Sequence, residues 1–90
     1  MIRVNEGYEL KQIVDDYIIV ATGDKAVKFS AVLVLNEVGV KVFKFLLDKK
    51  SEKEIIRALV SDYNIDEATA TADVLRFIGK LIDDGVCSRE

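Results

Sequence analysis

The sequence contains no histidine, no proline and no tryptophan, and its 90 residues include a single cysteine, Cys87. One cysteine cannot form an intramolecular disulfide bond, and a chain without histidine lacks a principal ligand of zinc sites. There is also no glycine-rich phosphate loop and no histidine base that would activate a nucleophile. These absences predict a protein that is not an enzyme and that uses no metal or other cofactor.

Basic charge is also in short supply. Thirteen lysine and arginine residues stand against 16 aspartate and glutamate residues, so the net charge is −3. Nucleic acids and anionic membranes attract proteins with a positive field, which this balance does not provide. The longest charge-free run, residues 29–36, is too short to cross a bilayer, and residues 1–6 lack the apolar segment of a signal peptide. We expect a cytoplasmic protein without a membrane or nucleic-acid partner.

Hydrophobic residues, in contrast, make up 50% of the chain, which predicts one compact domain over residues 1–90. Residues 8–14 alternate apolar and polar side chains, and residues 17–21 are rich in β-branched side chains, so both are predicted strands. A third strand is predicted over residues 27–35. Asp15 and Asp16 are expected to form the first turn, and short connections of this kind favour an antiparallel meander.

The remainder is predicted to form three helices, over residues 37–47, 51–63 and 67–84. Asn36 and Asp66 are suitable N-cap residues for the first and third helices, and Ser51 with Glu54 has the spacing of a capping box. Gly85 is expected to end the third helix. Three strands followed by three helices predict an α+β fold, with the helices packed on one face of an antiparallel sheet.

The third predicted strand has apolar residues on both faces. One face carries Phe29, Ala31, Leu33 and Leu35, and the other carries Ser30, Val32 and Val34. In a meander this strand also lies at the sheet edge, where proteins usually place charge or proline to prevent further pairing. Residues 29–36 contain neither, so we expect an open edge beside an uncovered apolar face.

The third predicted helix also has more apolar residues than one face requires. Its main stripe, which is sufficient for packing on the core, consists of Val74, Phe77, Ile78 and Leu81. A second stripe about a quarter-turn away consists of Ala68, Thr71, Leu75, Gly79 and Ile82. Inside a helix, Gly79 costs about 1 kcal/mol relative to alanine, so another group is expected to approach it closely.

An extended peptide that pairs with the open edge and buries its side chains between the third strand and the third helix would cover both surfaces. The residues predicted to bind it are Ser30, Ala31, Val32, Leu33, Val34 and Leu35 on the strand, and Thr71, Leu75, Ile78, Gly79 and Ile82 on the helix. The alternative is structural, because a small domain can bury a wide helical face and the edge can pair in a homodimer. We expect a monomer or a weak homodimer.

Several segments of the chain resemble a known protein family in their order and spacing. These segments are Phe29, residues 35–37, Gly39, residues 43–47, residues 51–55, residues 62–66, and residues 72–81 followed by Gly85. Together they extend over most of the chain, from Tyr8 to Val86. In this arrangement the sequence resembles the family of coenzyme PQQ synthesis protein D (PqqD), the small peptide chaperones also called RiPP recognition elements.

This resemblance implies a winged-helix-like fold and a non-catalytic function. Members of the family bind the leader segment of a ribosomally synthesised precursor peptide and present it to a modifying enzyme, often a radical SAM protein. The leader typically lies along the third strand and contacts the third helix. Many members have a tryptophan near this part of the first helix, where this sequence has Val42 and Phe43. We expect this difference to be a substitution within the core. The chain looks most like stand-alone relatives that serve peptide systems other than PQQ synthesis.

Two other functions would use the same features. In a winged-helix DNA-binding regulator the third helix would contact DNA. Its only basic residues are Arg76 and Lys80, and its acidic residues Glu67, Asp73, Asp83 and Asp84 would repel phosphate. A self-associating structural module would instead cover the edge with a second copy. We expect Asp73 to favour the helix dipole or to pair with Arg76 at i+3, and Arg76 and Lys80 to meet acidic leader residues or solvent.

Overall fold

The computed structural model describes residues 2–22 and 33–90. Its elements, in chain order, are β1 (Ile2–Val4), β2 (Tyr8–Ile13), β3 (Asp16–Ala21), β4 (Leu33–Leu35), α2 (Glu37–Leu47), α3 (Glu52–Tyr63), α4 (Glu67–Asp83) and β5 (Cys87–Arg89). Strands β2, β3 and β4 form an antiparallel sheet in that order. The predicted meander followed by three helices is therefore confirmed, and the part of the third strand predicted over residues 27–32 lies outside the described residues.

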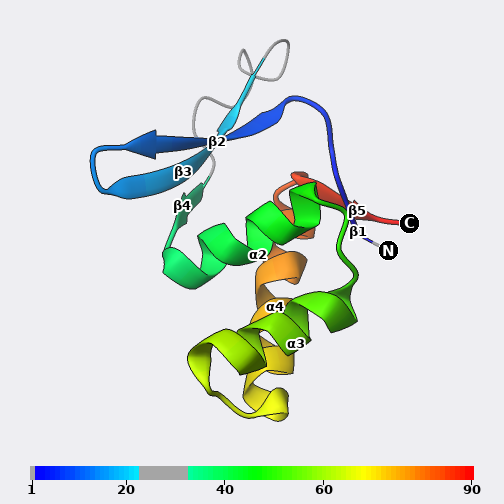
Figure 1. Ribbon diagram of the computed structural model, residues 1–90. Coiled ribbons are helices and arrows are strands. Elements are labelled where there is room, and N and C mark those ends of the chain that lie inside the picture. Colours follow the sequence, from blue (N-terminus) through cyan, green and yellow to red (C-terminus); the bar gives the residue numbers. More distant parts are fainter. Residues whose placement is uncertain (1, 23–32) are drawn as a thin grey trace.

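The sheet lies on one side of α2 and α3 on the other, while α4 crosses behind α2 (Figure 1). Ile19 of β3 and Leu35 of β4 belong to the same buried cluster as Phe43 and Leu46 of α2. From α4, Val74, Ile78 and Leu81 complete that cluster. One continuous core thus joins the sheet to the helices through α2. Within the described ranges, no helix is both long enough and apolar enough to span a membrane.

The β2–β3 turn differs from the prediction by one residue. Ile13 pairs with Asp16, so the two-residue loop is Val14–Asp15 and not Asp15–Asp16. This register places Leu10, which packs against the core, opposite the buried Ile19, whereas a loop at Asp15–Asp16 would place the exposed Gln12 there. As a result Val14 lies in the left-handed region with φ of 56°, where a β-branched residue is unusual.

Replacing Val14 with glycine is expected to stabilise the protein. The side chain of Val14 is 86% exposed, so little packing is lost. Removal of its Cβ relieves a left-handed conformation that costs about 1–2 kcal/mol for an L-residue, and the melting temperature should rise by about 4–8 °C for each kcal/mol gained. Thermal unfolding measures the effect. The same change at Val20, inside β3, should lower the melting temperature, and a decrease for both variants would contradict the strain at Val14.

The three predicted helix caps are all confirmed, and α3 begins at Glu52, one residue after the predicted bound. The Asn36 side-chain oxygen accepts a hydrogen bond from the Gly39 N–H at 2.8 Å, and Asp66 does the same for Thr69 at 2.9 Å. At α3, Ser51 and Glu54 form the reciprocal capping box, with distances of 3.1 and 3.2 Å. These bonds to the ionised carboxylates lower the pKa of Glu54 and of Asp66. The helices therefore begin where local hydrogen bonding dictates.

The end of α4 leads into a strand that the sequence pattern did not predict. Gly85 is left-handed with φ of 79°, and the Val86 N–H bonds to the Leu81 carbonyl at 2.8 Å, which ends the helix as expected. The chain then forms β5, which pairs antiparallel with β1. We refer to this two-stranded sheet as the terminal ribbon.

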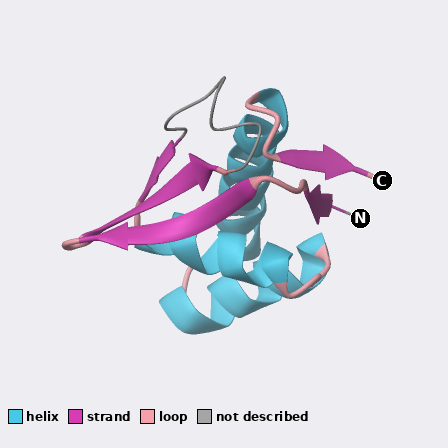
Figure 2. Ribbon diagram, turned by 90° about the horizontal axis from the view of Figure 1, so that it is seen from above, coloured by secondary structure: helices cyan, strands magenta, loops and turns pink. Residues whose placement is uncertain are grey.

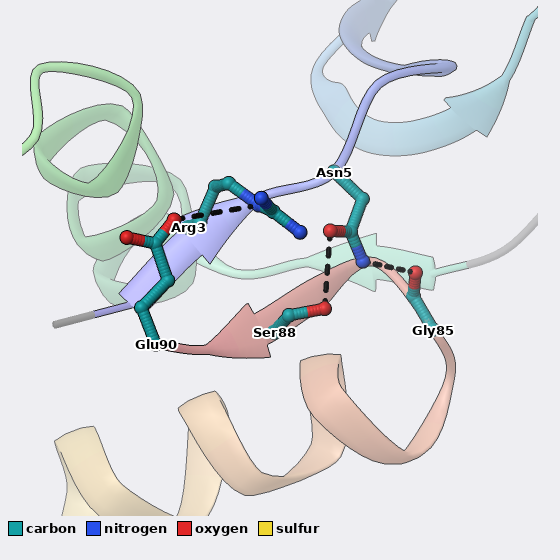
Figure 3. A network of polar contacts seen from close by, with 5 residues as sticks. All are labelled: Arg3, Asn5, Gly85, Ser88 and Glu90. Atoms are coloured by element: carbon teal, nitrogen blue, oxygen red, sulfur yellow. Dashed lines mark hydrogen bonds and ion pairs between the residues drawn. The ribbon is translucent and has the colours of Figure 1, made fainter.

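Side chains from both ends of the chain hold the terminal ribbon together (Figure 3). Asn5 donates a hydrogen bond to the Gly85 carbonyl at 3.0 Å and accepts one from the Ser88 hydroxyl at 3.1 Å. Arg3 and Glu90 form an exposed ion pair at 3.5 Å. The ribbon also covers the core, because Ile2 and Cys87 are almost completely buried. The first and last described residues are therefore structural parts of the domain.

Candidate functional site

A groove of about 380 Å³ lies between α2 and α4, and we call it the α2–α4 groove. Its lining comprises Asn36, Val38, Gly39 and Val42 from the start of α2, Leu59 from α3, and Asp73, Val74, Arg76, Phe77 and Lys80 from α4. Most of the lining is apolar and consists of valine, leucine and phenylalanine side chains. The polar and charged groups are Asn36 and the side chains on one side of α4. A concave apolar surface with a few polar groups is typical of binding sites.

The groove is shaped by a close approach between the two helices. An ideal Cβ built on Gly39 would lie 3.3 Å from Cε1 of Phe77 and 3.5 Å from Cβ of Leu35. The ring of Phe77 is therefore seated against the first turn of α2, directly beside the end of β4. It is half-buried, so part of the ring remains available to the groove.

The charged residues along the groove are paired with one another. Asp73 and Arg76 form the predicted i,i+3 ion pair at 2.6 Å, and Lys80 pairs with Asp84 at 3.4 Å. All four side chains keep substantial exposure, so each pair contributes little to stability. Because the charges are locally balanced, this side of α4 does not present the positive surface that a DNA-recognition helix requires.

Strand β4 stands next to the groove and at the edge of the sheet. It pairs with β3 on one side, and no other described strand pairs with it. Val34 is 69% exposed, while Leu35 faces the core and is 7% exposed. In Figure 2, β4 and α4 extend from the same side of α2. The edge of β4 leads through Leu35 and Asn36 into the α2–α4 groove.

The predicted strand residues have different outcomes. Ser30, Ala31 and Val32 lie outside the described residues, and Leu33 is part of β4. Val34 points outward as expected, so it can contact a ligand. The side chain of Leu35 is buried in the core while its backbone is part of the edge strand, so a contact with the peptide through its backbone stays a prediction. Burial of Leu35 follows from the strand alternation that exposes Val34.

The predicted helix residues do not line the groove beside β4. Thr71, Leu75, Gly79 and Ile82 lie on a different face of α4 from Phe77 and Lys80, and the buried face separates the two. Ile78 is completely buried, so its assignment as a binding residue is corrected to the core. Nothing lies within 4 Å of a Cβ built on Gly79, so the close approach expected there is absent from the described chain.

The α2–α4 groove also contains Val38, Gly39 and Phe77, which are not among the residues predicted to bind the peptide. Phe77 packs against the core, as its stripe predicts, and also borders the groove, because periodicity alone cannot distinguish a buried position from an adjacent groove wall. Gly39 offered only a weak signal, because the same argument from a helical glycine predicts a close approach at Gly79, where there is none.

A second cavity, of about 480 Å³, lies between the β3 side of the sheet and α2. Its aromatic residues are Tyr17, Phe45 and Tyr63. Lys44 lies over the ring of Tyr17 at 5.6 Å and Lys41 over that of Tyr63 at 5.1 Å. Lys41 also bonds to Asp62 at 2.8 Å, and this hydrogen bond raises the pKa of Lys41. Both lysines are therefore engaged within the chain.

Neither a reactive thiol nor a cluster of metal-ligand side chains is found in the described part of the chain. Cys87 is buried, and desolvation raises the pKa of its thiol to about 11, so the reactive thiolate is scarce near neutral pH. Among residues 2–22 and 33–90, no three side chains of histidine, cysteine, aspartate or glutamate are grouped to hold a metal ion. Cys87 serves as a packing residue of the terminal ribbon.

Two solved structures share this fold. One is TbiB1 in complex with the TbiA(beta) leader peptide, with a TM-score of 0.80, 18% identity, and coverage of 98% of this chain and 96% of that chain. The other is lasso peptide synthetase B1 complexed with the leader peptide, with a TM-score of 0.78, 18% identity, and coverage of 98% of both chains. Comparison with curated proteins gives no significant match.

The family assignment comes from the sequence. The family model of Coenzyme PQQ synthesis protein D (PqqD) matches residues 9–86, from β2 to the end of α4 and the residues that follow it. The match includes β4, Gly39 and Phe77. The resemblance drawn from the order of sequence segments is thereby confirmed, and the chain belongs to the PqqD family.

Proposed function

We propose that this protein is a non-catalytic adaptor that binds the leader segment of a ribosomally synthesised precursor peptide and presents it to a modifying enzyme. The leader adds as a strand to the free edge of β4, and its side chains enter the α2–α4 groove. The observation that carries the proposal is the joint position of an uncharged edge strand and an apolar groove at the Leu35–Asn36 corner.

The two surfaces have complementary contributions to binding. Backbone hydrogen bonds along β4 contribute about 0.5–1.5 kcal/mol each and do not distinguish between sequences. An apolar side chain buried in the groove contributes about 1.5–3 kcal/mol and does distinguish between them. Strand addition with side-chain pockets is an established mode of peptide recognition. Both similar solved structures contain leader peptides, and family membership points to the same class of ligand.

The partner enzyme is proposed from the family alone. A modifying enzyme, for example a radical SAM protein, would act on the core segment of the same precursor while the leader is held on β4. This protein supplies no reacting group in that scheme, because Cys87 is buried and the described charged side chains near the groove are ion-paired with one another. Its contribution is to raise the local concentration of the substrate.

An amide NMR titration tests the proposal. Isotope-labelled protein is titrated with the leader segment of a small precursor encoded beside its gene. We expect chemical-shift changes at residues 33–39 and along the side of α4 that carries Phe77 and Lys80. The absence of any change up to millimolar peptide would reject leader binding. If the protein is then a dimer by light scattering, the edge serves self-association.

A further inference from the structure

In the α2–α4 groove the ring of Phe77 lies against Gly39. We infer that Phe77, which lies against Gly39, limits the size of the leader side chain that the groove can accept. This inference rests on the proposed leader binding. Gly39 and Phe77 thus act together as a specificity-determining pair. The leader residue concerned is the apolar anchor, meaning the residue whose replacement with alanine weakens binding most.

The ring of Phe77 can take its position because glycine at position 39 has no Cβ atom. A Cβ at this position would meet Phe77 Cε1 and Asn36 Oδ1, each at 3.3 Å. Such distances are shorter than ordinary van der Waals contacts, so one neighbour would have to move. Asn36 is held in place by its hydrogen bond to the Gly39 N–H at 2.8 Å. The ring of Phe77, which is half-buried and borders the groove, is the group that can give way.

Comparison with the other helical glycine supports this interpretation. Nothing lies within 4 Å of a Cβ built on Gly79, so that position has room for a side chain. Gly39, in contrast, is buried, and its space is limited by a residue of a different helix. A glycine within a helix is unfavourable relative to alanine. At Gly39 the compensating gain is the seat for the Phe77 ring.

Among the apolar residues that line the groove, Phe77 is the one with the most freedom to change its position. Leu59, Val42 and Val74 are almost completely buried, so they form a fixed floor. Val38, which like Phe77 is partly buried, is a small residue with a restricted side chain. Phe77 is therefore the largest apolar side chain that both borders the groove and keeps exposed surface.

Three variants test the pair: Gly39→Ala, Phe77→Leu and the double variant. Each is titrated with a set of leader peptides that carry alanine, leucine, phenylalanine or tryptophan at the anchor position, and fluorescence anisotropy gives the dissociation constants. A change of one methylene group in an apolar pocket alters discrimination by roughly 10- to 200-fold. We use leucine at position 77 to limit the loss of packing, and thermal unfolding of each variant confirms that it is folded.

We expect Gly39→Ala to weaken the peptide with the largest tolerated anchor about tenfold and to leave the alanine-anchor peptide almost unchanged. Phe77→Leu should shift the preference toward the next larger anchor, and in the Phe77→Leu background Gly39→Ala should no longer weaken binding, because the ring that its Cβ would displace is gone. If all variants rank the peptides as the wild type does, or if the two effects simply add, the pair does not set the size limit. If the wild type binds no leader peptide, the proposed function fails instead.

Discussion

Replacing Val34 with aspartate is expected to weaken leader binding by at least about 100-fold, which corresponds to roughly 2.7 kcal/mol. Val34 is 69% exposed at the centre of the described part of β4. A docked strand would bury this position, and a carboxylate there would lose its hydration without gaining a partner. A charge on an edge strand is also how proteins prevent strand addition. Fluorescence anisotropy with a labelled leader peptide measures the loss.

The fold should survive the Val34 substitution. Exposed substitutions usually change stability by less than about 0.5 kcal/mol, so the melting temperature should fall by only a few degrees. A matched control is Ile13→Asp, which places the same charge at an exposed apolar position of β2, the opposite edge strand. That variant should bind the leader as the wild type does. Wild-type affinity for Val34→Asp would show that the peptide does not use β4.

Leu75→Asp provides the second comparison, because it separates the two faces of α4. Leu75 is 45% exposed and belongs to the stripe first predicted to bind the peptide, whereas the α2–α4 groove lies on the other side of the helix. If the leader enters the groove, Leu75→Asp should leave the affinity nearly unchanged. If Leu75→Asp abolishes binding while the protein stays folded, the peptide contacts the originally predicted stripe.

Replacing Phe43 with alanine is expected to have the largest effect on stability. Its side chain has no exposed surface, and it belongs to the cluster in which β3, β4 and all three helices meet. Removing a buried phenylalanine side chain costs about 3–5 kcal/mol, a large part of the roughly 5–15 kcal/mol that stabilises a domain. The melting temperature should fall by about 4–8 °C for each kcal/mol lost.

Phe45 is the matched control for Phe43. It lies two residues further along α2, is partly buried, and borders the second cavity. The same replacement at Phe45 should lower the free energy of unfolding clearly less, because Phe45 is only partly buried and borders a surface cavity. Urea unfolding followed by circular dichroism compares the two variants. Equal losses would show that the complete burial of Phe43 does not make its contribution to stability larger than that of the partly buried Phe45.

The helices were predictable because their signals are local. The Asn36 cap, the Ser51–Glu54 capping box and the Asp66 cap each use residues three positions apart, so the sequence alone displays them. The first turn was less predictable, because Asp15–Asp16 has favourable turn residues. The observed register instead pairs Leu10, a residue packed on the core, with the buried Ile19, and the left-handed conformation then falls on Val14.

The position of the groove could not be read from the sequence. Both sides of α4 carry apolar residues, and which side faces β4 depends on how α2 and α3 pack against the helix. The same limitation applies to the terminal ribbon. Its strands have three residues each, too few to show a period, and they pair the two ends of the chain. Long-range packing thus decided the features that periodicity left open.

The terminal ribbon determines where this domain can be tethered. Ile2 lies opposite Arg89, so the two ends of the chain leave the domain side by side, and in Figures 1 and 2 they lie far from β4. A tag or a fused enzyme attached to either end would be held at the same place and would leave the sheet edge accessible. A short loop could also join the two ends, so that a circularly permuted chain would keep the binding surface intact.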